Sequence, residues 1–79
     1  MASMRKRVSF RGIVRGEQGE EAECTGSATE VSLPGLPPQY VQFHIDTVSK
    51  PLPDGNYTVF ALGQSAPARY VNGQWLAPT

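Results

Sequence analysis

The chain has 79 residues, a formal net charge of zero and one cysteine, Cys24. This length fits one small domain, and the single cysteine excludes an intramolecular disulfide. One histidine and one cysteine are too few for a structural zinc site, which usually takes four ligands. Because a core of this size supplies only about 3–5 kcal/mol of net stability, we include a homo-oligomer among the expected states.

The sequence has no apolar run of the roughly 18 residues that a membrane-spanning helix needs. No apolar region follows the basic N-terminus, as it would in a secretory signal, and an unpaired cysteine fits a reducing compartment. We therefore expect a cytoplasmic protein with no membrane partner. We expect residues 1–4 to be a disordered N-terminus or a cloning remnant, and residues 5–79 to form a single small β domain.

Charge changes sign along the first part of the chain. Basic residues come first and glutamates follow: Arg5, Lys6, Arg7, Arg11 and Arg15, then Glu17, Glu20, Glu21, Glu23 and Glu30. Residues 5–15 and 20–27 both alternate in polarity with a period of two, which is typical of half-buried strands. A polar turn at residues 16–19 separates them, so we expect an antiparallel hairpin whose charges neutralise each other.

Side-chain matching predicts the register of this hairpin. Pairing Phe10 with Cys24 and Arg11 with Glu23 sets apolar against apolar and positive against negative. A shift by one residue would instead put Phe10 opposite Thr25. We therefore expect the first register, with Cys24 buried beside Phe10 as a small apolar side chain.

The apolar positions change parity further along, from the even-numbered Cys24 to the odd-numbered Val31 and Leu33. A β-bulge near residues 26–27 would let the strand change face, and we expect one there. The proline-rich residues 34–38 then predict a stiff loop.

Residues 39–48 fit two patterns. Val41, Phe43 and Ile45 alternate as in a strand, although the apolar residues also form a stripe at helical spacing. A helix would leave Phe43 on its polar side, and most residues here are β-formers, so we expect a strand.

Two turn signals organise the C-terminal half. Residues 50–56 contain Asp54-Gly55, which suits a tight reversal. Residues 56–63 then read as a strand with apolar side chains on both faces, as in the centre of a sheet.

The second turn signal is Asn72-Gly73, which predicts a two-residue type I′ hairpin within residues 66–77. This hairpin places Tyr70 opposite Trp75. Pro67 marks either the start of its first strand or a sheet edge, because proline has no N–H to donate.

These elements predict an all-β fold, a small antiparallel meander of five or six strands curled into a barrel or an open sandwich. SH3-like and OB-like barrels are the analogy in size and strand count alone. Such a fold does not specify a function.

The sequence offers little for catalysis, and we expect neither an enzyme nor a cofactor. Cys24 falls on the apolar face of its strand, whereas His44 falls on a polar face. His44 and Asp46 share that face, but two ligands are too few for a metal site. The glutamates cluster in an exposed hairpin, and the chain has no phosphate-binding loop.

We expect a non-catalytic interaction module that binds a protein partner or assembles with itself. Small β domains with proline-rich loops and exposed edges often act in this way. Tyr70 and Trp75 are candidate anchors if they face solvent, while the opposite interpretation places Trp75 in the core. Compact phage and mobile-element adaptors and inhibitors share this size and character.

The alternative is binding of single-stranded nucleic acid. Its candidate residues are the N-terminal cations, namely Arg5, Lys6, Arg7, Arg11 and Arg15. An aromatic side chain such as Tyr40, Tyr70 or Trp75 would stack a base. The balanced net charge and the neighbouring glutamates favour the protein partner over this alternative.

Overall fold

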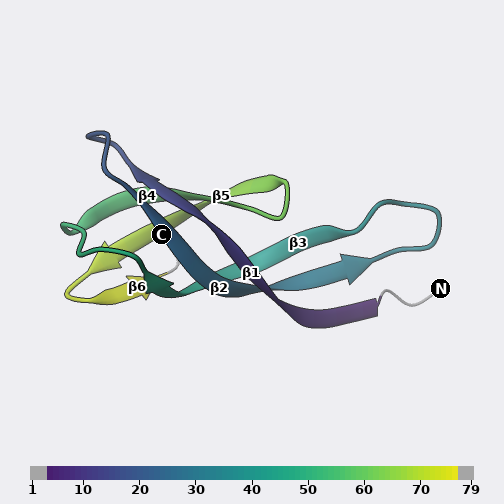
Figure 1. The fold of residues 1–79 in the computed structure, drawn as a ribbon. Coiled ribbons are helices and arrows are strands. Elements are labelled where there is room, and N and C mark those ends of the chain that lie inside the picture. Colours follow the sequence, from purple (N-terminus) through teal and green to yellow (C-terminus); the bar gives the residue numbers. More distant parts are fainter. Residues whose placement is uncertain (1–3, 77–79) are drawn as a thin grey trace.

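The computed structural model describes residues 4–76, and these residues form six strands joined by turns and loops (Figure 1). The strands are β1 (Met4–Gly16), β2 (Glu21–Ser32), β3 (Gln39–Val48), β4 (Gly55–Ala61), β5 (Gln64–Val71) and β6 (Gln74–Leu76). Met4 thus opens β1, and residues 1–3 of the expected N-terminal segment lie outside the described residues. The strand expected at residues 39–48 is confirmed by β3.

All strands belong to one antiparallel sheet with the order β3-β2-β1-β4-β5-β6. It consists of two three-stranded meanders, joined where the last part of β1 pairs with β4 and Ile13 lies opposite Phe60. The sheet curls into a nearly closed barrel, which confirms the all-β class and the small barrel. The pairing of β1 with β4 is a long-range contact that local patterns do not predict.

One end of the sheet extends beyond the barrel as an arm, which contains the start of β1, the end of β2 and the loop at residues 33–38 (Figure 1). The molecule is therefore elongated, with principal extents of 44 × 21 × 18 Å. The proline-rich loop lies at the tip of the arm. There Leu36 N–H donates to the Leu33 carbonyl, and Gly35 has a φ of 77° that favours glycine.

The register predicted for the first hairpin is wrong by two residues. Phe10 lies opposite Gly26, Arg11 lies opposite Thr25, and Cys24 lies opposite Gly12. The turn decides this register, because Gly16 N–H bonds to the Glu20 carbonyl and β2 begins one residue later. The inward faces were correct, since a shift of two residues returns every side chain to the same side of the sheet.

The irregularity expected near residues 26–27 is present, but the extra residues lie in β3. Asp46 is an unpaired extra residue between the pairs Thr25–Thr47 and Gly26–Ile45. Further along, two β3 residues, Gln42 and Phe43, lie opposite the single β2 residue at position 28. Gln42 has a φ of 55° at this bulge. The alternation of β2 continues inward to Ala28, so the predicted change of face at residues 26–27 of β2 is wrong.

Two glycines let the strands cross closely enough for the sheet to curl. A Cβ on Gly26 would overlap the His44 carbonyl oxygen on β3, and a Cβ on Gly12 would overlap the Phe60 carbonyl oxygen on β4. Both positions therefore exclude a side chain.

The C-terminal meander contains two two-residue turns of the same kind. Asn72-Gly73 has φ angles of 52° and 80°, and Tyr70 lies opposite Trp75, as predicted. Leu62-Gly63 forms the β4–β5 turn with φ angles of 57° and 72°, so β5 begins at Gln64. Pro67 lies within β5 rather than at its start, and no described residue of β6 pairs with it, as predicted for a sheet edge.

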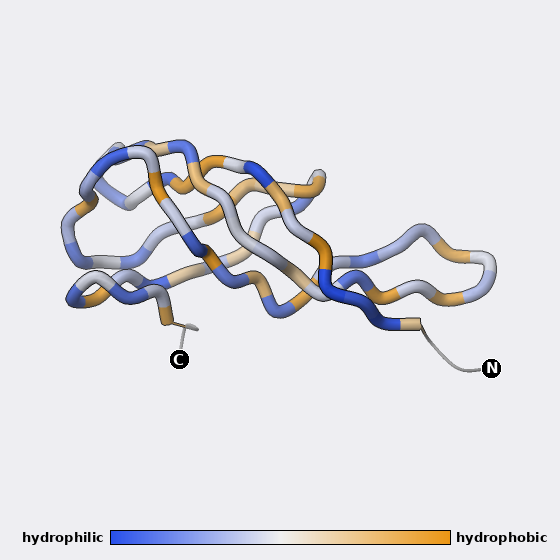
Figure 2. Tube along the Cα trace, turned by 60° about the horizontal axis from the view of Figure 1, so that its bottom comes forward, coloured by the Kyte–Doolittle hydropathy of each residue, from blue (hydrophilic) through white to orange (hydrophobic). Residues whose placement is uncertain are grey.

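The core fills the inside of the barrel. It consists of Phe10, Val14, Ala22, Cys24, Ala28, Ile45, Leu52, Tyr57, Val59 and Ala61. The arm adds little to it, although Figure 2 shows hydrophobic positions near the arm tip. Met4, Leu33 and Leu36 are all exposed there.

Candidate functional site

Within residues 4–76 no strand pairing closes the barrel, and the two edges that face each other form a seam. One edge is β3, which pairs only with β2 among the described residues. The other edge is the first part of β5, residues 64–68, because the described residues of β6 pair with Arg69–Val71 alone. Both edges therefore carry backbone groups without a strand partner in the described chain, and such edges are templates for another strand.

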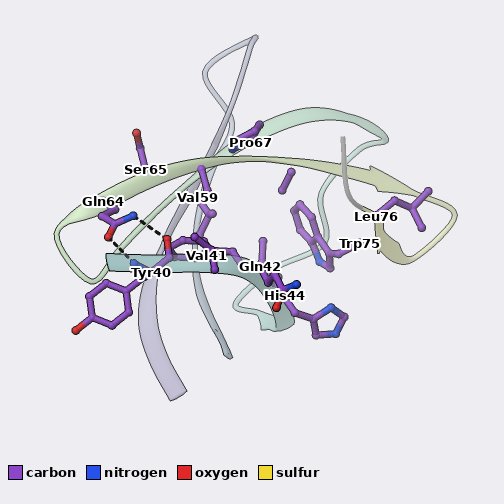
Figure 3. Close-up of a pocket in the computed structure, with 14 residues that line it drawn as sticks. Tyr40, Val41, Gln42, His44, Val59, Gln64, Ser65, Pro67, Trp75 and Leu76 are labelled. Carbon is purple, nitrogen blue, oxygen red and sulfur yellow. Dashed lines mark hydrogen bonds between the residues drawn. The ribbon is translucent and has the colours of Figure 1, made fainter. Parts of the chain in front are cut away.

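A single side chain bridges the seam at one end. Tyr40 N–H of β3 donates to Gln64 Oε1 at 2.9 Å, and Gln64 Nε2 donates to the Tyr40 carbonyl at 3.0 Å. The primary amide thus makes the pair of hydrogen bonds that the N–H and C=O of one residue of an adjacent antiparallel strand would make (Figure 3).

Beyond this bridge the seam opens into a groove of about 560 Å³. Its walls come from β3 and β5, and its far end from β6 (Figure 3). The lining residues are Tyr40, Val41, Gln42, Phe43, His44, Ile45, Val59, Gln64, Ser65, Ala66, Pro67, Ala68, Trp75 and Leu76. This set, taken from the described part of the chain, contains no Asp, Glu, Lys or Arg, and its volume is within the range of ligand pockets.

Of the two aromatic residues predicted as anchors, Trp75 lines the far end of the groove and Tyr70 packs against it from outside. Trp75 packs on Tyr57 with ring centroids 5.5 Å apart and on Tyr70 with centroids 4.6 Å apart. Trp75 and Tyr70 are both half-buried. Trp75 therefore packs against the core on one side and lines the groove on the other, while Tyr70 supports it from outside the groove.

The structure does not bring the five predicted cations together in one groove. Arg15 forms an ion pair with Glu21 at 2.8 Å and lies over the Phe60 ring at 5.6 Å. Lys6 Nζ lies 3.6 Å from Glu30 Oε1 and forms a second ion pair. These contacts match the expected neutralisation between the first two strands, with different partners from those predicted.

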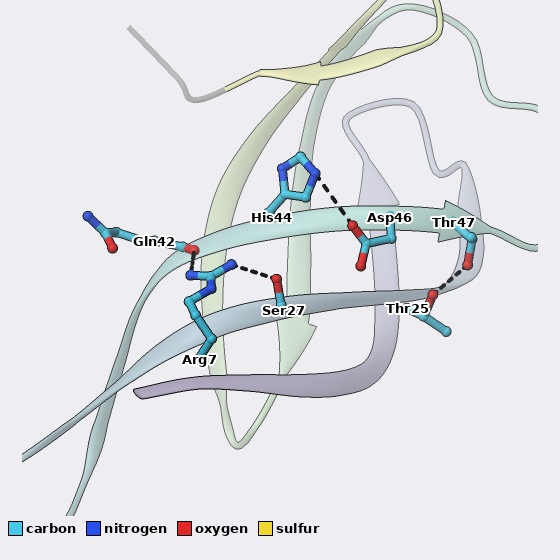
Figure 4. Close-up of polar contacts among 7 residues, drawn as sticks. All are labelled: Arg7, Thr25, Ser27, Gln42, His44, Asp46 and Thr47. Carbon is cyan, nitrogen blue, oxygen red and sulfur yellow. Dashed lines mark hydrogen bonds and ion pairs between the residues drawn. The ribbon is translucent and has the colours of Figure 1, made fainter. Parts of the chain in front are cut away.

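Arg7 has a structural role at the β3 bulge. Its Nη1 donates to Thr29 Oγ1 at 2.9 Å. Nη1 also donates to the Gln42 carbonyl at 3.0 Å, and Nη2 donates to Ser27 Oγ (Figure 4). The guanidinium thus crosses β2 to reach a carbonyl of the irregular β3 segment. Arg5 and Arg11 are exposed and make no side-chain hydrogen bond or ion pair within residues 4–76.

The groups considered for catalysis lie apart. Cys24 is buried, and burial raises the pKa of its thiol above the usual range. His44 is exposed and lies 3.5 Å from Asp46 (Figure 4). Within the described residues, no three His, Cys, Asp or Glu side chains are close enough together to hold a metal ion.

Tyr40 links the groove to the arm. Its hydroxyl donates to Glu30 Oε2 at 3.0 Å, and this hydrogen bond, with burial and the glutamate charge, raises the pKa of the Tyr40 hydroxyl. The Lys6–Glu30 pair continues the contact onto β1. Tyr40 is thereby fixed from both ends, through its backbone by Gln64 and through its side chain by Glu30.

Sequence reasoning named Trp75 and Tyr70 but missed the seam. The signal that could have found it is the absence of Asp, Glu, Lys and Arg from residues 31–45 and 55–68. These two runs supply the facing edges of the groove, whereas most charges lie on β1 and β2. Their juxtaposition depends on the curl of the sheet, which the runs alone do not show.

Comparisons with protein-family models, with curated proteins and with solved structures returned no match to this chain. Residues 4–76 contain no helix long and apolar enough to cross a membrane.

Proposed function

We propose that this protein is a non-catalytic interaction module, which binds a protein partner by accepting an extended, uncharged segment at the seam between β3 and β5. The observation that carries the proposal is the bidentate amide of Gln64 on the Tyr40 backbone. A side chain there already makes the contacts of a missing strand, next to a groove in which both edges lack one in the described chain.

The chemistry of the groove supports this kind of partner. Val59 and Ile45 are buried core residues that also line the groove, and Trp75 lines the far end of the groove. Apolar side chains entering from a bound strand would be removed from water, at about 25 cal/mol for each Å² buried. A charged side chain would be desolvated there without an ionic partner among the described lining residues, so the groove selects against charge.

The test is selection of peptides from a random displayed library, followed by calorimetric titration of the best synthetic peptides. We expect the selected sequences to lack charges at the positions that enter the groove. Val41→Glu and Leu76→Glu place a charge on the lining at residues that are 38% and 45% exposed, so both variants should fold. Either change should weaken binding by about tenfold or more, equivalent to about 1.4 kcal/mol.

Leu36→Glu is the matched control, because Leu36 is 60% exposed and lies on the arm tip, outside the groove. It should bind the peptides like the unchanged chain. Peptides that bind all three variants equally would contradict the seam as the site. Light scattering across protein concentrations measures whether the chain self-associates. Self-association through the seam would mean that a second copy supplies the segment and that the protein is a homo-oligomer.

A further inference from the structure

A second free edge lies on β1, away from the seam. β1 pairs with β2 along its length from Met4 to Arg15, but β4 covers only Ile13–Gly16 on its other side. Residues 4–11 therefore present one edge that no strand of the described chain covers. Figure 1 shows this part of β1 running along the arm toward the N-terminus.

This edge carries several cations, and two of them have no ion pair within residues 4–76. Arg5, Arg7 and Arg11 lie on one face of β1, as odd-numbered residues of a strand do. Arg7 leans across β2 toward β3, whereas Arg5 and Arg11 have no ion pair within residues 4–76. They lie about 20 Å apart along the strand, at roughly 3.3 Å per residue.

We propose that the free edge of β1 binds an extended acidic peptide segment of a partner as an added strand. The backbone of residues 4–11 would supply the ladder, and Arg5 and Arg11 would select carboxylates at alternate positions of the segment. Residues between those positions would face Lys6, Val8 and Phe10, so β-branched side chains fit there. This docking surface is separate from the seam and does not depend on the function proposed for it.

Charge also disfavours the simplest competing occupant, a second copy of this chain. A second copy pairing antiparallel about a two-fold axis through Val8 would set each Arg5 opposite the partner's Arg11. Like charges directly opposite each other destabilise a strand pair, and cations on an edge strand oppose self-association. The same cations attract an acidic strand.

A nucleic acid fits this edge less well than an acidic strand. Binding of single strands relies on aromatic faces that stack bases. The aromatic side chain within residues 4–11 is Phe10, which is only 7% exposed and packs on Phe43. The edge thus offers backbone hydrogen bonds and arginines but no stacking platform within residues 4–11.

The experiment uses a short fluorescent peptide of alternating Glu and Thr, titrated by anisotropy against the full chain. We expect saturable binding, with slower hydrogen exchange in residues 4–11. The double variant Arg5→Glu/Arg11→Glu should weaken binding by about tenfold or more. The control Lys50→Glu/Arg69→Glu changes the net charge equally at exposed positions away from this edge, and it should bind like the unchanged chain.

Two further probes separate strand addition from other binding. A Glu-Thr peptide that is N-methylated at every residue keeps the charge but lacks all backbone N–H donors, and binding equal to that of the unmodified peptide would overturn the proposal. Tighter, Arg5- and Arg11-dependent binding of an oligothymidine strand would overturn it in favour of nucleic acid. Val41→Glu should leave binding unchanged, and sensitivity to it would place the peptide in the seam.

Discussion

Gln64 closes the sheet by bonding with its side chain to both backbone groups of Tyr40. The two hydrogen bonds measure 2.9 and 3.0 Å, and they join β5 to β3 where no strand pairing does so in the described chain. The two residues are separated by 24 positions and lie on opposite edges of one sheet. At this end, one side-chain amide thus links the two edges within the described chain.

Replacing Gln64 with alanine should therefore loosen the seam. Each hydrogen bond contributes about 0.5–1.5 kcal/mol net, so we expect the free energy of unfolding to fall by about 1–2 kcal/mol. The Tyr40 amide should also exchange its hydrogen faster, because it loses its acceptor. Urea denaturation and hydrogen exchange measure the two effects.

Gln74→Ala is the matched control, because Gln74 is exposed and its side chain makes no hydrogen bond within residues 4–76. It should change stability by less than about 0.5 kcal/mol. Gln64→Glu keeps an acceptor for Tyr40 N–H but brings a carboxylate to the Tyr40 carbonyl, so it should be no more stable than Gln64→Ala. An unchanged exchange rate at Tyr40 in both Gln64 variants would contradict the bridging role.

The sequence predicts local features of this fold well, because they depend on neighbouring residues. The alternation in β3 and the Asn72-Gly73 turn lie within short segments, and both are confirmed. The sequence does not predict the register of the first hairpin correctly, because the pattern of inward and outward side chains repeats every two residues. Only the turn at residues 16–20 distinguishes the two registers.

Features that join distant segments leave no local signal. The Leu62-Gly63 turn lacks the usual Asn or Asp at its first position, so residues 56–63 read as one continuous strand. The seam requires β3 and β5 to meet through the curl of four other pairings. Tyr40 and Gln64 are ordinary strand residues until that curl is known.

Replacing Gly26 tests whether the close approach of β2 and β3 is needed for the curl of the sheet. Gly26→Ala places a Cβ against the His44 carbonyl oxygen and 2.8 Å from the Phe10 ring. Backbone cannot move aside as a flexible side chain does, so we expect a loss of at least about 3 kcal/mol. That is comparable to the whole stability expected for a domain of this size, and circular dichroism should show a largely unfolded chain at 25 °C.

Gly19→Ala is the comparison for this variant. Gly19 has a φ of 90°, but a Cβ added there would meet nothing within 4 Å, so only the backbone conformation opposes alanine. We expect a loss of about 1–2 kcal/mol and a folded chain. Equal stabilities for the two variants would show that β2 and β3 do not cross closely at Gly26.

Arg7 should stabilise the β3 bulge more than its exposure suggests. Arg7→Ala removes the donor to the Gln42 carbonyl and to two hydroxyls on β2. Because the site is open to solvent, we expect a modest loss of about 1 kcal/mol. Amide exchange should become faster in the β3 segment around Gln42.

Arg5→Ala is the control for this prediction, since Arg5 lies on the same face of β1 and makes no such contacts within residues 4–76. It should leave both stability and β3 exchange unchanged. Equal effects of the two substitutions would mean that general charge, rather than the contacts of Arg7, stabilises the arm.

Alkaline pH should destabilise the fold through two tyrosines. The hydrogen bond to Glu30 raises the pKa of Tyr40, and burial raises that of Tyr57. A raised pKa means that the folded chain holds these protons more tightly than the unfolded chain, whose tyrosines titrate near pH 10. This contribution is complete below about pH 10 and is lost as the pH rises through the folded-state values.

Tyr40→Phe measures the first of these contributions. At about pH 8 the variant should be less stable than the unchanged chain, because it lacks the hydrogen bond to Glu30. Above about pH 10 the difference should shrink, since ionisation of Tyr40 removes the same bond from the unchanged chain. Denaturant titrations at both pH values measure this difference in the free energy of unfolding. A difference that stays constant across this range would show that ionisation of Tyr40 is not coupled to folding.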